Sequence, residues 1–406
     1  MYRLADILGE RGHNVTILNY KLTEEAAKPR LKYCNEVIFD ARSDFFKKIF
    51  DLKTEEFLQD VAWNSTNSNL DYFRKLYKFL CLGAIANIFF LHNKTMLDEF
   101  LEMEKFDLAI IYQFDTASFA LSRTLGIDKV IWVSTSYFLD PMPWTSGIST
   151  PASHVPSGSH PVTDHMIFIE RVWNLLLRIF FELGHYFLNI RYYNMVNSYF
   201  YRPDIPDLSD LLSSVDLYML NSNAFLEYPR PIANNVIDIS GLAYMDEPSG
   251  DIIKKWDYIM RQTKSQIGTI IFSLGSVIDS SLMSSFLKSN FLDSFKALKS
   301  HTFIMRLDGE KVNGSTYPNV IFQDWIPQRY LIRRFKVDVL ITHGGYNSIS
   351  EAAYFGLPTI VIPFCGDQFG NVKRQEKLQT GISLEKESLT KGNILSALDR
   401  VLADDK

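Results

Sequence analysis

Cysteine is scarce in this chain of 406 residues, and its spacing excludes a common kind of site. The three cysteines, Cys34, Cys81 and Cys365, form no CxxC motif and no Cys/His pattern of the kind that binds structural zinc. An Asp-x-Asp motif is also missing. We therefore expect neither a metal nor another cofactor.

Long charge-free apolar runs are missing as well. The nearest candidate, residues 79–91, is shorter than the roughly 18 apolar residues that a spanning helix needs. The chain opens on LADILGERGHNVTIL (from residue 4) without the basic and apolar regions of a signal peptide. From the sequence as it stands we expect neither a signal peptide nor a transmembrane anchor.

Positive charge is not in excess either. The net charge is −5, and no block of lysines and arginines occurs. Proteins that bind nucleic acid usually carry a basic patch or stripe, because they neutralise phosphates. The composition therefore argues against a nucleic-acid partner.

Apolar residues are abundant, at 47%, and the length suffices for two α/β domains with separate cores. A polar, charged stretch over residues 245–266 suggests a linker followed by a short helix. We accordingly place one domain at residues 1–244 and the second at residues 245–406.

The first domain shows strands with helical segments between them. Residues 4–11 suit a helix, and apolar β-branched runs predict strands at 14–18, 106–114, 129–136, 215–223 and 235–242. Residues 44–106 have a mostly helical pattern. A doubly wound fold normally opens on a central strand, so we expect another strand upstream of this first helix.

Two segments of this domain have an unusual composition. Residues 140–164 form a long loop rich in Pro, Ser and Gly, and such loops often shape binding sites. Residues 168–201 are aromatic and helical in pattern. A membrane-surface helix and the wall of an acceptor pocket both fit this stretch, but a buried helix or helix pair is favoured.

The second domain begins with a strand that ends in a Ser-Leu-Gly-Ser loop at residues 273–276, and strands at 302–307 and 319–327 follow. In residues 337–363 we expect a strand, a His343-Gly-Gly turn, a helix capped by Asn347 or Ser348, and another strand. A helix that begins after a Gly-rich turn offers N–H groups and a positive dipole end. Phosphate is its natural ligand.

Residues 325–368 also carry W-x-P-Q, H-G-G-x-N-S-x-x-E-A, G-x-P and D-Q in order. This window closely resembles the family-1 glycosyltransferases, with animal UDP-glucuronosyltransferases as the nearest match, and weaker likeness extends over almost the whole chain. The resemblance implies an α/β GT-B fold, in which two Rossmann-like doubly wound domains face each other across a cleft. It also implies that the first strand of the N-terminal domain and the C-terminal crossing helices are missing from the chain as given.

The resemblance implies a role for each matching residue. Trp325 would stack on uracil and Gln328 would read its edge, while Glu351 would accept a ribose hydroxyl. A plain structural alternative exists for Glu351, because Ser348-x-x-Glu351 is also a capping-box pattern. The implied contacts of the diphosphate and the sugar are Ser276, Arg306, His343, Gly345, Tyr346, Asn347, Ser348, Asp367 and Gln368. Arg306 carries less weight, since Met305 replaces the usual Trp before it.

Transfer in the family inverts the anomeric carbon. A histidine, oriented by an aspartate, deprotonates the acceptor hydroxyl, and Asp115 matches that aspartate. The resemblance places the histidine at the end of the first strand, upstream of the helix at residues 4–11. We therefore expect the chain as given to bind UDP and to transfer sugar poorly.

The expected function is hexosyl or glucuronosyl transfer from UDP-glucuronate or UDP-glucose to the hydroxyl of a small lipophilic acceptor. The alternative is a catalytically impaired UDP-sugar-binding relative that acts as a partner or regulator of full-length enzymes. The family resides in the membrane and lumen of the endoplasmic reticulum. Association with a membrane surface, and homo- or hetero-oligomers, are compatible with the resemblance.

Overall fold

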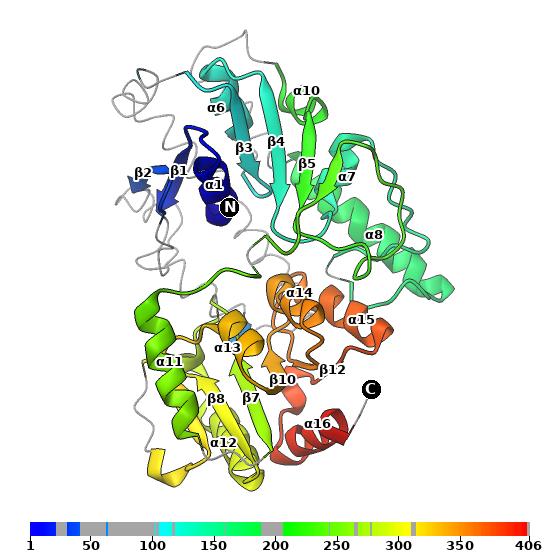
Figure 1. Ribbon diagram of the computed structural model, residues 1–406. Helices are drawn as coiled ribbons and strands as arrows, with labels where there is room; N and C mark the ends of the chain where they lie inside the picture. Colours follow the sequence, from blue (N-terminus) through cyan, green and yellow to red (C-terminus); the bar gives the residue numbers. More distant parts are fainter. Residues whose placement is uncertain are drawn as a thin grey trace. The chain divides into compact units, whose positions relative to one another are not determined.

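A computed structural model describes residues 1–21, 31–40, 62–63, 102, 105–115, 118–158, 160–187, 206–242, 244–263, 267–276, 278–309 and 314–403. The chain forms two compact units (Figure 1). The first consists of residues 1–58, 67–160 and 164–242. The second consists of residues 243–406 together with two short pieces of earlier sequence, 59–66 and 161–163. Each unit is described by itself below.

The second unit is built on a parallel sheet of six strands, in the order β12-β11-β10-β7-β8-β9. The strands expected from the apolar, β-branched runs are confirmed. Their bounds are β7 (Gly268–Ser273), β8 (His301–Arg306), β9 (Val320–Gln323), β10 (Val337–Thr342) and β11 (Thr359–Val361). The sixth strand, β12 (Gly381–Ser383), was not among the expected ones.

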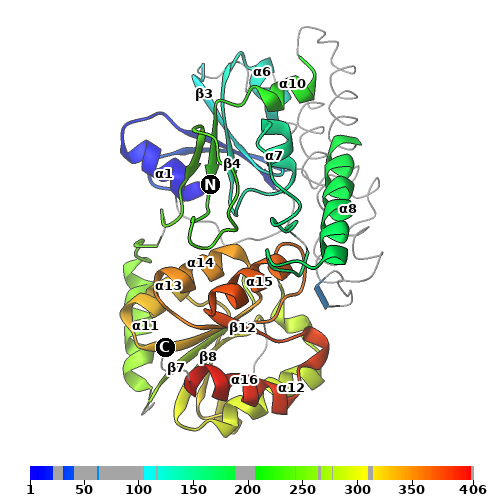
Figure 2. The ribbon, with the colours of Figure 1, turned by 90° about the vertical axis from the view of Figure 1, so that its right-hand side faces the viewer.

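Helices cover both faces of this sheet, as a doubly wound fold requires. Along β7, Ile270 and Phe272 pack into one apolar cluster, whereas Ile271, between them, packs into another. This alternation follows from the two-residue period of a strand. Figure 2 shows helices on either side of the sheet. The first cluster includes α12 (Ser285–Ala297) and α16 (Lys391–Ala403), and the second α11 (Gly250–Gln262), α13 (Gln328–Arg334) and α14 (Tyr346–Tyr354).

The first unit contains a parallel sheet of four strands and a separate parallel pair. The four-stranded sheet has the order β3 (Leu108–Tyr112), β4 (Lys129–Ser134), β5 (Leu217–Leu220) and β6 (Val236–Asp238). The pair is β1 (Thr16–Lys21) with β2 (Asn35–Asp40), and α1 (Tyr2–Glu10) precedes it. The core of the larger sheet gathers around Trp132, which is fully buried between Phe119 and Tyr218. The remaining helices of this unit include α6 (Ser118–Thr124), α7 (Pro141–Ser146) and α10 (Leu208–Ser213).

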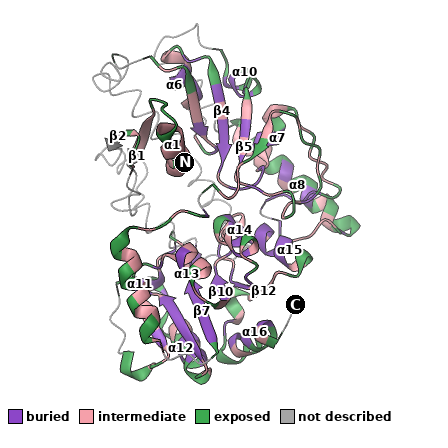
Figure 3. Ribbon diagram, viewed as in Figure 1, coloured by how far each residue is buried: buried purple, intermediate pink, exposed green. Residues whose placement is uncertain are grey.

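Helix α8 (Phe168–His185) turns its polar side toward the protein. Asn174 and Arg178 are buried, while Phe168, Trp173 and Phe180 are each more than half exposed (Figure 3). The expectation of a buried apolar helix is therefore wrong for the described part of residues 168–201. The polar side of the helix is buried, despite the apolar pattern, because its polar groups have hydrogen-bond partners in the preceding loop.

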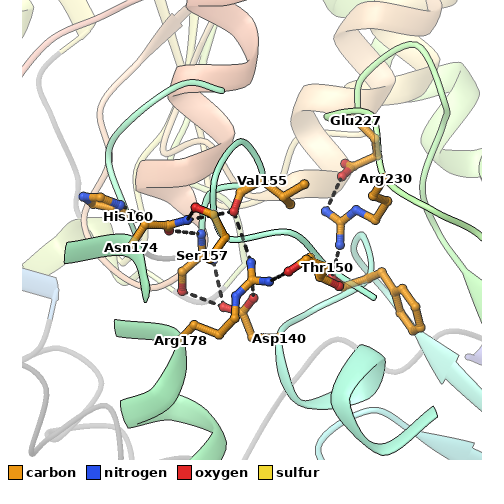
Figure 4. Close-up of polar contacts among 12 residues, drawn as sticks. Asp140, Thr150, Val155, Ser157, His160, Asn174, Arg178, Glu227 and Arg230 are labelled. Atoms are coloured by element: carbon orange, nitrogen blue, oxygen red, sulfur yellow. Dashed lines mark hydrogen bonds and ion pairs between the residues drawn. The ribbon is translucent and has the colours of Figure 1, made fainter. Parts of the chain in front are cut away.

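Those partners are Asp140, the N-cap of α7, and residues 150–157 of the loop that follows this helix (Figure 4). The long loop expected at residues 140–164 therefore begins with a short helix. Asn174 Nδ2 donates to the carbonyl of Val155 at 2.9 Å, and its Oδ1 accepts from the N–H of Ser157 at 2.7 Å. Arg178 donates to the carbonyls of Thr150 and Val155 and lies 3.6 Å from a carboxylate oxygen of Asp140. The loop is thus fastened to α8 by groups that would each be costly to bury alone.

Several expectations fall on residues that the structure does not describe. Most of the helical stretch at 44–106, and residues 188–201 of the aromatic stretch, lie outside the described residues. Among the helices that are described, none is both long and apolar enough to cross a bilayer.

Removing the ring of Phe295 should destabilise the second unit. Phe295 is fully buried and stacks on Phe303 with 4.1 Å between ring centroids. Phe295→Ala should lower the free energy of unfolding by about 3–5 kcal/mol, measured by urea denaturation. The matched control is Phe286→Ala on the same helix, because Phe286 is 68% exposed and should change stability by no more than about 0.5 kcal/mol. Equal losses in the two variants would contradict this account of the core.

Candidate functional site

The strand order of the second unit creates a switch point between β7 and β10. From β7 the chain proceeds through β8 and β9 to one side, and β10, β11 and β12 lie on the other side. The loops that follow β7 and β10 therefore diverge from neighbouring strand ends. In open α/β sheets, ligands bind at the carboxyl edge of such a point.

Two glycines allow these loops to come together around His343. A Cβ atom on Gly275 would lie 2.4 Å from His343 Cε1, and one on Gly345 would lie 2.6 Å from Nε2. Either distance is too short for a real side chain. Gly275 also has φ +77°, a conformation that disfavours other residues. The imidazole ring is thus held between two backbone segments that only glycine can supply.

His343 is neutral at physiological pH. Burial, together with the positive charge of Arg306, lowers the pKa of its imidazole to about 4. Its Nδ1 lies 3.3 Å from the hydroxyl of Thr342. A neutral imidazole still offers one N–H donor, so this ring can hydrogen-bond to an anion.

Arg306 joins the end of β8 to both neighbouring strand ends. Its guanidinium donates to the carbonyl of Gly275 on one side and, at 3.0 Å, to the carbonyl of Asp324 on the other. Asp308 neutralises its charge, with Oδ1 2.8 Å from Nη2. The guanidinium carbon lies 5.1 Å from the ring centroid of Trp325, which is 49% exposed. The cation and the open aromatic ring form a flat surface on which a planar ligand can stack.

Gln328 and Glu351 are brought together although 23 residues separate them. Gln328 Nε2 donates to Glu351 Oε2 at 2.8 Å, and Arg329 Nε lies 3.5 Å from Oε1. Burial raises the pKa of Glu351, while Arg329 and Gln328 oppose this shift. The pair offers an amide and a carboxylate that can recognise neighbouring polar groups of one ligand.

The expected cap of helix α14 is wrong. The helix begins at Tyr346 and its N-cap is Gly345, so neither Asn347 nor Ser348 caps it. The capping box that was the structural alternative for Glu351 is not formed either, because Ser348 is the third residue of the helix. The side chain of Tyr346 is buried, whereas Asn347 is exposed. The helix therefore starts two or three residues earlier than expected, close behind His343 and Gly344.

A turn after β11 carries the two remaining candidates of this unit. Gln368 Oε1 accepts from the N–H groups of Phe364 and Cys365, at 2.7 and 3.0 Å. Gln368 is thereby buried and closes the turn. Asp367 is half-buried and is the N-cap of α15 (Gln368–Leu378).

Asn371 was missed by the sequence reasoning. It is fully buried, and its Nδ2 donates to the carbonyl of Gly344 at 2.9 Å and to Asp367 Oδ2 at 3.0 Å. One side chain thus ties the glycine turn after β10 to the turn after β11. The signal available in the sequence was its position four residues after Asp367, on the same face of the helix.

Ser276 and Asp115 occupy different units. Ser276 is exposed in the loop after β7, next to Gly275. Asp115 follows β3 in the first unit, and its carboxylate accepts from the N–H of Ser118 at 3.2 Å and from the Ser118 hydroxyl. Asp115 therefore bonds to the first residue of α6, a structural task that is compatible with a second, functional one.

The structure thus gathers most of the predicted residues of the second unit at the carboxyl edge of one sheet. Arg306, Trp325, His343 and Asp367 follow four different strands there. Within the part of the chain that the structure describes, no cluster of three or more His, Cys, Asp or Glu side chains could hold a metal ion.

Two α/β units with parallel sheets define the GT-B class of glycosyltransferases. The calicheamicin glycosyltransferase CalG4, a solved structure, has this fold. Its structure is similar to this chain with a TM-score of 0.60 and 14% sequence identity. The match covers 100% of this chain and 86% of the CalG4 chain. The chain belongs to the UDP-glucuronosyl and UDP-glucosyl transferase family, whose family model matches residues 1–406.

Relatives in vertebrates support this assignment. UDP-glucuronosyltransferase 3A2 of Homo sapiens is 28% identical over 417 residues, which cover 100% of this chain and 75% of the human protein. UDP-glucuronosyltransferase 3A1 of Xenopus laevis is 30% identical over 311 residues, covering 76% of this chain and 58% of the frog protein. The expectations of family and fold class are confirmed.

The low pKa of His343 should be visible as a pH dependence of stability. The ordinary pKa of histidine is about 6.5, so between about pH 6.5 and 4 the unfolded chain binds a proton at this residue that the folded chain does not. The free energy of unfolding therefore falls as the pH falls through this range. His343→Asn should make the fall less steep in urea denaturation, and part of it should remain because burial also lowers the pKa of His185 to about 4.

The matched control is His13→Asn, which replaces an exposed histidine of the first unit. It should leave the slope of stability against pH as in the wild type. A His343→Asn variant with the wild-type slope would show that the imidazole is not held neutral by its surroundings.

Proposed function

We propose that this protein binds a UDP-sugar at the carboxyl edge of the six-stranded sheet and transfers its hexosyl or glucuronosyl group to the hydroxyl of a small lipophilic acceptor. The observation that supports this most directly is the position of His343. Its neutral imidazole is packed between Gly275 and Gly345 at the switch point, where α/β folds bind nucleotides.

The nucleoside end of the donor would lie on Trp325. Its half-exposed ring is backed by the Arg306 guanidinium and presents a face for uracil. Gln328 and Glu351 are hydrogen-bonded neighbours, so one can read the edge of the base while the other accepts a ribose hydroxyl. Glu351 suits this task because a carboxylate accepts from two hydroxyls at once.

The diphosphate would lie at the start of α14. The N–H of Gly345, the first turn of the helix with Asn347 and Ser348, and the imidazole of His343 all supply donors there, with Ser276 on the opposite loop. Tyr346 would contribute through its backbone, because its side chain is buried. These groups can offset the charge of a departing UDP without a metal ion.

The sugar would contact Asp367 and Gln368. The Asp367 carboxylate can accept from sugar hydroxyls, while the Gln368 amide oxygen is occupied by two backbone N–H groups. Gln368 Nε2 donates to Cys365 Sγ at 3.5 Å, so one N–H of this amide would be left to bind the sugar. For transfer, Asp115 is proposed to orient the histidine base that deprotonates the acceptor, with inversion at the anomeric carbon.

Replacing Trp325 should weaken nucleotide binding. Stacking of a base on an aromatic side chain contributes about 1–3 kcal/mol, so Trp325→Ala should raise the dissociation constant for UDP about 5- to 150-fold in titration calorimetry. The matched control is Trp144→Ala, since Trp144 is a 66% exposed tryptophan of the first unit. Failure of the wild-type chain to bind UDP would overturn the proposal, and equal affinities in the two variants would remove Trp325 from the site.

A transfer assay on the same protein separates the two functions that the resemblance leaves open. Wild-type protein is incubated with UDP-glucuronate or UDP-glucose and a phenolic acceptor. Product formation supports the enzyme. UDP binding with no product from either donor contradicts transfer by the chain as given, and it is also the result expected of the alternative, a UDP-sugar-binding relative.

Helix α8 supports a second part of the proposal, association with a membrane surface. Its inward side chains are polar, and its outward ones include Phe168 at 82% exposure and Trp173 at 57%. Arg171 is the one charged residue among the exposed positions of this helix. An aromatic, nearly uncharged outer face is more favourable in the interfacial region of a bilayer than in water.

Charges placed on that face should abolish vesicle binding. The double variant Phe168→Glu/Phe180→Glu changes two exposed side chains and should leave stability nearly unchanged. Wild-type protein should float with phosphatidylcholine vesicles in a density gradient, and the variant should not. Phe286→Glu, at a 68% exposed site of the second unit, is the control and should float. A wild-type protein that stays at the bottom of the gradient contradicts membrane association.

A further inference from the structure

Two residues from the first half of the sequence, Ala62 and Trp63, are part of the second unit. Ala62 is only 2% exposed and lies in the apolar cluster that α12 and α16 form with the sheet. We call these two residues the 62–63 segment. Sequence reasoning gave them no task.

The 62–63 segment contacts three separate loops. The Trp63 ring meets the Phe364 ring edge-on, with 5.1 Å between centroids and 72° between planes. Its Nε1–H donates to the carbonyl of Asp279 at 3.2 Å. The carbonyl of Ala62 accepts from Lys386 Nζ at 3.0 Å. Three contacts therefore hold this segment in place.

One of these loops is the turn that carries Asp367. Phe364 is buried, and its N–H donates to Gln368 Oε1, the bond that closes the turn. A shift of Phe364 would consequently move the backbone on which Asp367 stands. Trp63 restricts that shift, since its ring packs against the Phe364 ring.

The second loop leads to Arg306. Next to Asp279, Ser280 exchanges hydrogen bonds with Asp308: its hydroxyl donates to Asp308 Oδ2 at 2.8 Å and accepts from the Asp308 N–H at 2.9 Å. Asp308 in turn pairs with Arg306. The indole N–H therefore bonds to a loop that is connected to Arg306, the cation that backs Trp325 in the proposed site.

We propose that Trp63 is a positioning residue, which sets the sugar-binding turn at 364–368 relative to the loop after β7. This inference rests on the proposed function, because it assigns Asp367 to the sugar. The ring of Trp63 acts on the turn, whereas its N–H acts on the loop. A residue that only fills the core would change stability without distinguishing UDP from a UDP-sugar.

The test compares the affinity for UDP-glucose with the affinity for UDP by titration calorimetry. Trp63→Ala should weaken UDP-glucose binding about 10-fold more than UDP binding, because the turn that meets the sugar loses its support. Trp63→Phe keeps an aromatic ring against Phe364 and should restore most of the discrimination. Phe364→Leu should reproduce the effect of Trp63→Ala, and the double variant should add little to either change.

Trp256→Phe is the matched control. Trp256 is a buried tryptophan of the same unit, in the cluster on the opposite face of the sheet. This variant should lower stability and leave the ratio of the two affinities unchanged.

The outcomes separate the inference from the function on which it rests. A wild-type chain that binds neither ligand overturns the proposed function, and the inference with it. A wild-type chain that binds both, with wild-type ratios in Trp63→Ala and Phe364→Leu, overturns the inference alone. Should Trp63→Ala not fold, Trp63→Phe and Phe364→Leu carry the comparison.

Discussion

The close approach of two loops around one imidazole ring is the constraint on which the candidate site depends. His343 fits between Gly275 and Gly345 only because neither has a side chain. The switch in strand order places these loops at adjacent strand ends, and the glycines allow contact. Because the ring is enclosed and lies near Arg306, its pKa falls and it stays neutral. An uncharged hydrogen-bond donor therefore sits at the start of a helix, where an anion is favoured.

The polar groups around this contact support one another across several loops. Arg306 is neutralised by Asp308 and donates to the carbonyls that flank it, so a half-buried cation costs little. Asn371 connects the glycine turn to Asp367 in the same way. Side chains at the ends of different strands therefore hold one another in position. This arrangement suits the recognition of an extended ligand at several points.

In the first unit, too, buried polar side chains have their partners in another segment of the chain. Arg178 and Asn174 bury polar groups beneath a long loop, and α8 therefore presents its apolar side outward. Burial raises the pKa of Glu182, on the same helix, to about 7, although Arg178 opposes the shift. Burying such polar groups costs little only where they find hydrogen-bond partners, as Asn174 and Arg178 do in this loop.

The sequence by itself determined most of the strands, their parallel α/β arrangement and the family, because apolar periodicity and closely spaced motifs are local properties. The strands β2 and β12 were not predicted. It also placed His343, Trp325 and Asp367 at strand ends. The tertiary structure alone decided which of these meet, since strand order and loop contacts join residues far apart in the chain. Asn371 and Trp63 contact residues far from them in the sequence, which only the structure shows. Helix α8 was expected to be buried, but it exposes its apolar side because the partners of its polar side chains lie in another segment.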